Sequence, residues 1–325
     1  MTIVEVSDRQ EPSSVLPGSL PPPPGLSRPG PVSVSDPSHR AADRSPVVDR
    51  VAFVVRSALV LLAALMLGFL AYLVWGSGLE HRVVQGREFT ELRNELANGT
   101  APRGPRRLGG QVLPLGTPIA LLEIPSIGLK EVVDEGTTSS VLMAGPGHLR
   151  STVFPGGVGT SVIYGREAAY GGPFFAIHAL ARGSRIIVTT QVGTSTFRVV
   201  DVRKAGALIP ALAPGTGRLT LATATGSAFL PTGVVYVDAD MVGPALAARA
   251  PLPTVSASEQ AMAGDSGGFR GVALGLELLA VILAAAIWAW SRRGHAQAWI
   301  VFSAPVALAA LYLVDQAARL LPNLM

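Results

Sequence analysis

The residues best suited to nucleophilic chemistry lie in one apolar run, LTLATATGS, whose candidate hydroxyl groups are on Thr223, Thr225 and Ser227. A threonine attacks a carbonyl only when a base lies within hydrogen-bond reach, and the histidines of the surrounding region are His148 and His178. The chain contains no cysteine, which excludes thiol catalysis, disulfides and thiolate zinc sites. Hydroxyl-based catalysis is therefore one hypothesis for this chain.

A second polar feature follows the apolar run SVIY, where Gly165 leads into the charged pair Arg166 and Glu167. An arginine side chain, with a pKa above about 12, can hold an anion but cannot serve as a base at neutral pH. Arg166 is therefore suited to binding rather than to proton transfer.

Sequence motifs for other chemistry are absent. The chain has no phosphate-binding loop, calcium-binding loop, His-x-x-x-His spacing or Gly-x-Ser-x-Gly motif, so we predict no cofactor and no metal site. The net charge is +4, but the basic residues are scattered or lie beside apolar segments, so we predict no nucleic-acid partner.

Three apolar runs are long enough to cross a membrane as helices: 51–75, 271–291 and 298–321. The loop between the last two, 292–297, is short and carries two arginines, which favours the cytoplasm. We therefore expect a multi-pass protein of the cell membrane. Its N-terminus would be cytoplasmic, the long middle segment and the end of the chain extracytoplasmic, and the last two spans available to membrane-protein partners.

The remaining segments differ in composition. Short β-rich runs separated by Gly, Pro and Thr fill residues 117–243, and about seven of them predict a mainly β, closed or nearly closed barrel or a sandwich. We predict a disordered, Pro/Ser-rich cytoplasmic tail at 1–50, a stalk helix at 79–100, and solvated or flexible linkers at 101–116 and 244–270.

Several ordered motifs in the β-rich segment resemble the sortases, cell-surface cysteine transpeptidases of Gram-positive bacteria, particularly the actinobacterial housekeeping, class E-like types. The motifs are IPSIGLK, GPGH, SVIYG, YGGPF and LTL. The resemblance implies a closed sortase-like β-barrel. It also implies that the positions of the catalytic histidine, cysteine and arginine fall on Arg166, Ala224 and, at or near it, Gly233. The chain would then be a degenerate member that lacks all three groups.

This resemblance implies an inactive protein that binds or scaffolds a polypeptide or cell-wall component through the old peptide groove. The candidate groove residues are Arg166, Glu167, Tyr170, His148, Thr223 and Thr225. Two alternatives stay open. One is an active hydrolase or transpeptidase with a relocated Ser or Thr nucleophile, and the other is a structural subunit of a membrane complex.

Overall fold

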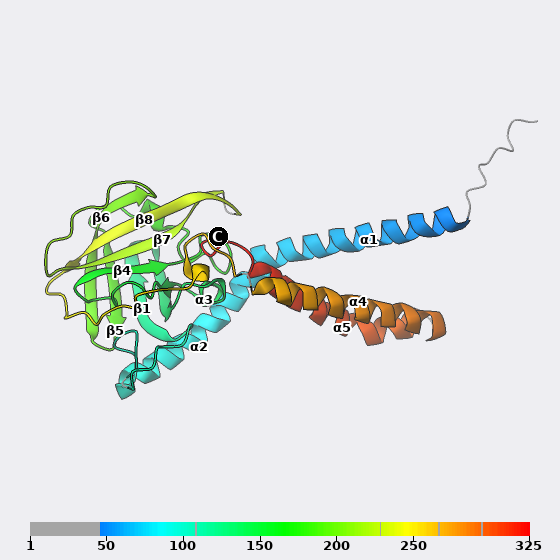
Figure 1. Cartoon of the computed structure of the whole chain (residues 1–325), viewed down its shortest axis with the longest axis horizontal. Helices are drawn as coiled ribbons and strands as arrows, with labels where there is room; N and C mark the ends of the chain where they lie inside the picture. The colour runs from blue at the N-terminus through cyan, green and yellow to red at the C-terminus, as the bar shows by residue number, and fades with distance from the viewer. Residues whose placement is uncertain (1–45, 108, 228, 266, 294) are drawn as a thin grey trace, which may run out of the picture. The chain divides into compact units, whose positions relative to one another are not determined.

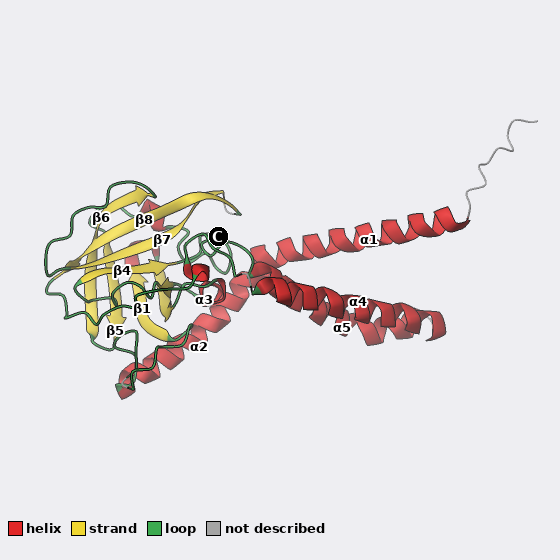
Figure 2. Cartoon of the chain, in the orientation of Figure 1, coloured by secondary structure: helices red, strands yellow, loops and turns green. Residues whose placement is uncertain are grey.

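The computed structural model describes residues 46–107, 109–227, 229–265, 267–293 and 295–325 (Figures 1 and 2). The predicted tail lies outside these residues up to position 45. Helix α1 (Pro46–Ala71) begins before the predicted start at 51. The chain divides after Arg56 into two units, and the features below belong to the second, Ser57–Met325.

Eight strands of the described chain form a closed barrel in the order β1-β2-β3-β4-β7-β8-β6-β5, which confirms the predicted fold (Figure 2). All neighbouring strands are antiparallel except the pairs β2–β3 and β4–β7. The strands are β1 Pro118–Ile124, β2 Leu129–Glu135, β3 Gly147–His148, β4 Gly159–Tyr164, β5 Arg185–Thr190, β6 Gly193–Lys204, β7 Gly217–Ser227 and β8 Leu230–Val242. Each predicted β-rich run contains one strand, whereas the two-residue β3 is too short to show any alternation.

Strand β7 is covered on both faces of the sheet. Every residue from Gly217 to Ala224 is buried, although successive side chains of a strand point to opposite faces. Leu219 and Leu221 belong to the barrel core, while Ala222 and Ala224 belong to a second apolar cluster on the other face. The face that carries Ala224 therefore packs against further parts of the chain.

At two glycines of the sequence motifs, a side chain would clash with neighbouring atoms. A Cβ on Gly147 would lie 2.1 Å from the backbone oxygen of Gly136, where no side-chain carbon fits. A Cβ on Gly165 would lie 2.5 Å from the ring of Phe174, which packs directly on the strand end. Helix α3 (Ser139–Ala144) lies between Gly136 and Gly147 and was not predicted, because six residues are too few to show a helical period.

The first predicted span and the predicted stalk are continuous in helical structure. A π-helical turn at Tyr72–Gly76 joins α1 to α2 (Ser77–Asn98), and the predicted break between 75 and 79 is absent. Gly99, with φ of 74°, ends the helix after Asn98, close to the predicted end at residue 100.

Helix α2 packs on the barrel instead of standing free. The Gln85 side chain accepts from the Val132 backbone N–H at 2.7 Å and donates to the Ala144 oxygen at 3.2 Å. Beneath α2 lies the fully buried Asp134. Burial, and then the neighbouring Glu88 carboxyl, raise the pKa of Asp134 well above its usual range.

As predicted, three helices are long and apolar enough to cross a membrane: Leu62–Asn98, Gly268–Ala289 and Ile300–Ala318. Helices α4 (Gly268–Arg293) and α5 (His295–Ala318) leave only position 294, which lies outside the described residues, for the predicted loop at 292–297. In the last turn, Asp315 forms an ion pair with Arg319 at 3.0 Å.

Both predicted linkers are irregular in structure but are bound to the barrel. In the first, 101–116, Leu113 is buried in the barrel core. In the second, 244–270, the backbone N–H of Leu252 donates to the barrel at 3.0 Å, and Glu259 is almost fully buried. The expectation of solvated or flexible tethers is therefore wrong, because each segment supplies apolar or charged side chains that the barrel buries.

Candidate functional site

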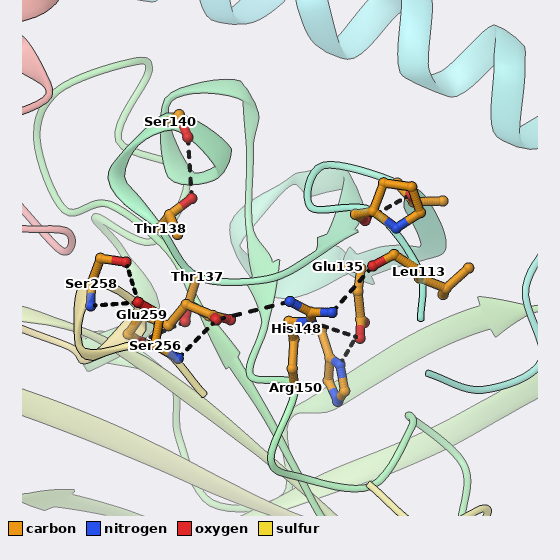
Figure 3. Close-up of polar contacts among 12 residues, drawn as sticks. Leu113, Glu135, Thr137, Thr138, Ser140, His148, Arg150, Ser256, Ser258 and Glu259 are labelled. Carbon is orange, nitrogen blue, oxygen red and sulfur yellow. Dashed lines mark hydrogen bonds and ion pairs between the residues drawn. The ribbon is translucent and has the colours of Figure 1, made fainter. Parts of the chain in front are cut away.

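His148 belongs to a buried ionic network and not to a groove (Figure 3). Its Nδ1 lies 2.9 Å from Glu135 Oε2, and its Nε2 lies 3.0 Å from the backbone oxygen of Val153. Arg150 lies between Glu135 and Glu259, at 3.8 and 4.0 Å from their carboxylates. Both ring nitrogens of the fully buried His148 are engaged in this network, and Arg150 links the network to Glu259. The His148 side chain therefore offers no accessible surface to a ligand.

The predicted loop arginine is turned inward. Arg166 is fully buried, although its position after a glycine-flexed strand end suggested an exposed cation. Its Nη2 donates to Ser139 Oγ at 2.8 Å, its Nη1 donates to the Met325 backbone oxygen at 3.2 Å, and its guanidinium lies 5.2 Å from the Tyr170 ring centre. Burial lowers the pKa of Arg166 to about 10, so the side chain stays charged at neutral pH.

Glu167 and Tyr170 are buried as well. The Tyr170 backbone has φ of 52°, its N–H donates to Ser77 Oγ at 3.1 Å, and its ring meets the Tyr72 ring edge-on at 6.4 Å. Burial raises the pKa of Tyr170 to about 12. Tyr170 therefore fixes the loop to the junction of α1 and α2, and the loop that follows Gly165 offers less accessible surface than predicted.

The hydroxyl groups of Thr223 and Thr225 on β7 make no hydrogen bond to a base in the part of the chain that the structure describes. Thr223 is buried and donates to the Gly165 oxygen at 2.8 Å, and Thr225 is half-buried beside Gly233 of β8. Among the described residues no hydrogen bond joins either threonine to a histidine. His178 lies exposed in the turn Ile177–Ala179. The nucleophile and base expected of a relocated mechanism are therefore not brought together.

Ala224 lies on an apolar surface that other parts of the chain cover. We call this surface the Ala224 surface and define it by Leu142, Tyr164, Ala222, Ala224 and Val234. The residue that packs on it is Leu324, which follows the last membrane-spanning helix and is fully buried.

The segment Leu320–Met325, which we call the cap segment, lies over this surface and over Arg166. Residue 325, at the point marked C in Figure 1, is only 4% exposed. The Glu167 N–H donates to the Leu324 oxygen at 3.0 Å, in addition to the Arg166 contact with Met325. No sequence pattern indicates this contact, because its partners lie about 160 residues apart along the chain.

An open hollow of about 560 Å³ lies beside the same loop. Its wall includes Lys130, Glu131 and Glu167, together with the half-buried Phe229 and the exposed Phe175. Both signs of charge and two aromatic rings are thus accessible next to the covered site, which suits a polypeptide better than a single small ion.

A family model for the sortase domain matches residues 122–233, about a third of the chain. No curated protein matches the chain. Solved structures similar to it include a sortase D5 transpeptidase from Clostridium perfringens (22% identity, TM-score 0.41), with 50% of this chain and 99% of that chain covered.

Two class E sortases are among the similar structures. Sortase E1 from Streptomyces coelicolor, with a tripeptide in the active site, has 22% identity and a TM-score of 0.36, with 40% and 91% of the two chains covered. Sortase E from Streptomyces avermitilis has 24% identity and a TM-score of 0.35 at the same coverage. The family match places Arg166 and Ala224 inside the matched sortase domain.

Proposed function

We propose that this chain is a catalytically inactive, membrane-anchored protein with a sortase-like barrel. It would bind or scaffold a polypeptide or cell-wall component at the outer surface of a Gram-positive, actinobacterial cell. The observation that carries this proposal is the state of the position where the sortase nucleophile would stand. Ala224 offers only a methyl group there, and it is buried in one apolar cluster with Leu324.

The surroundings of Ala224 support the same proposal. Acyl transfer needs a nucleophile, a proton acceptor and a donor for the oxyanion. The positions that the resemblance implies carry a methyl group, a fully buried guanidinium bound to Ser139 and Met325, and, at or near Gly233, no side chain. Arg166 is a hydrogen-bond donor, but the position implied for the nucleophile carries no reactive group.

The proposed topology places the barrel outside the cell. The two arginines at the end of α4, Arg292 and Arg293, favour the cytoplasm for the turn that joins α4 to α5. The contact of the cap segment with the barrel requires both to lie on the same side of the membrane. The hollow beside Glu167 is the surface that we propose for the partner.

Crosslinking in living cells tests this proposal. A photoreactive residue at Phe175, which is 61% exposed beside the hollow, should capture an extracytoplasmic polypeptide or wall fragment. The same residue at Ile209, 69% exposed on the β6–β7 loop, is the matched control and should capture none. Equal capture at both positions, or capture of cytoplasmic proteins only, would contradict the proposal.

A structural subunit is the second candidate function, and one observation favours it. The α4–α5 hairpin is bound to the barrel through both flanking segments, because Asn323 donates to Ser258 and Gln260, and residues 256–259 are bound to Arg150 and Thr137. Such a hairpin can transmit force between a membrane partner and the barrel. A photoreactive residue at Leu308, 68% exposed on α5, should then capture one membrane protein in a fixed ratio to this chain. Failure to capture such a protein would refute this candidate.

A further inference from the structure

We propose that the Ala224 surface is a binding site for a short apolar peptide, and that the cap segment is its resident ligand. The cap segment must be withdrawn before another polypeptide can bind there. This inference goes beyond the proposed function, which assigns the partner to the hollow beside Glu167. The Ala224 surface would be a second, regulated peptide site on the same inactive barrel.

The cap segment is held as a bound peptide through its backbone. The Glu167 N–H donates to the Leu324 oxygen at 3.0 Å, Arg166 donates to the Met325 oxygen at 3.2 Å, and the Asn323 N–H donates to the Ala263 oxygen at 2.8 Å. Backbone contacts of this kind do not depend on the side chains of the bound peptide. The site can therefore accept other peptides with the same spacing of apolar and amide groups.

Two side chains of the cap segment define what the site selects. Leu324 fills the apolar surface around Ala224. One residue earlier, the Asn323 side-chain amide donates to the backbone oxygens of Ser258 at 2.7 Å and Gln260 at 2.8 Å. Because both partners are acceptors, a carboxylate at this position would be repelled and left without a donor. The preferred ligand thus carries an amide followed by a large apolar side chain.

The acceptor side of the site is preformed on the barrel. Ser256 and Glu259 form a capping box around the turn that supplies the oxygens of Ser258 and Gln260. Thr137 Oγ1 donates to the Glu259 oxygen at 2.6 Å, and Figure 3 shows the link from this turn through Arg150 to the barrel. In this proposal the cap segment moves, while the turn that supplies the Ser258 and Gln260 oxygens stays bound to the barrel.

The hairpin controls this movement, because the cap segment continues directly from α5. A Cβ on Gly271 of α4 would meet the side chain of Gln316 at 2.1 Å, and one on Gly275 would meet Leu313 at 3.2 Å, so the two helices are in close contact along this end. A shift of α5 along its axis would pull Leu324 and Asn323 out of their places. A partner that moves the hairpin would thereby open the Ala224 surface and expose the charge of Arg166.

Thiol accessibility in the full chain tests this proposal, because the chain has no cysteine of its own. In lipid nanodiscs, Ala224→Cys should react slowly with a maleimide. Adding Leu324→Asp or Asn323→Asp should speed the reaction at least about tenfold, since each replaces a buried partner with an uncompensated carboxylate. Leu208→Asp, the same change at a residue that is 93% exposed, should leave the rate unchanged.

A free peptide that copies residues 319–325 should then slow the reaction of both opened variants. The same peptide with aspartate in place of asparagine should not. If the rates of closed and opened variants are equal, the cap segment does not control the site, and the proposed function stands apart from that failure. If the opened variants react fast but no peptide protects them, the binding site itself is refuted. The Asn323→Asp variant keeps all apolar contacts, so the test survives if Leu324→Asp fails to fold.

Discussion

Replacing Leu324 with alanine should loosen the cap segment without unfolding the barrel. The leucine is fully buried in one apolar cluster with Leu142, Tyr164 and Val234, and a Leu→Ala change at such a site costs about 2–5 kcal/mol through lost transfer energy and a residual cavity. Because these contacts form only when the cap segment is bound, the cost falls on its docking equilibrium. At about 1.4 kcal/mol per tenfold change, a cost near 3 kcal/mol raises the open population about 100-fold.

Amide hydrogen exchange reads this population directly. The Glu167 N–H is bonded to the Leu324 oxygen, so its exchange should become about 100-fold faster in Leu324→Ala. The Gly165 N–H, which is bonded to Ala222 within the barrel, serves as the internal control and should keep its rate. Leu208→Ala, at an exposed position, should change neither amide. An unchanged Glu167 rate, or equal acceleration of Glu167 and Gly165, would refute the reasoning.

Two further predictions concern buried charges. Arg150→Met should lower the free energy of unfolding by about 3 kcal/mol, because Glu135 and Glu259 are left buried without their cation. The exposed ion pair of Arg182 supplies the control, since Arg182→Met should cost less than about 1 kcal/mol. Both variants are compared by thermal unfolding in nanodiscs at neutral pH. Equal losses of stability in the two variants would contradict this account. Because Asp134 has a raised pKa in the folded state, its contribution is present at acid pH and is lost as pH rises through that pKa, so Asp134→Asn should flatten the decline of thermal stability with pH. An unaltered pH profile in this variant would show that the carboxyl does not titrate as proposed.

The barrel could be predicted because its signals are local. Strands such as RIIVTT and GVVYVDAD show β-branched composition between turn residues, and seven such runs nearly fix a small closed sheet. Gly147 and Gly165 of the motifs also have a local explanation, since no Cβ fits at either position. These features depend on neighbours in sequence or on general sterics.

The site was predicted only in outline because its surroundings depend on distant contacts. The loop sequence GREAAYGG indicates a charged, flexible surface, but Arg166 is buried by Ser139 and Met325, which lie far away along the chain. Residues 79–100 were predicted only as a stalk helix, yet Gln85 of α2 uses its amide to dock on β2. Such pairings carry no periodicity or motif, so only the folded arrangement identifies them.

The most direct test of the central claim is a search for covalent chemistry on β7. The full chain and its opened variant, Leu324→Asp, are each incubated in nanodiscs with a hydroxyl-directed electrophile and, separately, with a sorting-type peptide. Including the opened variant ensures that the cap segment does not hide an active hydroxyl. An inactive barrel predicts no adduct by intact-protein mass spectrometry and no peptide cleavage in either form. An adduct on Thr223 or Thr225, with peptide cleavage that Thr225→Ala abolishes, would contradict it.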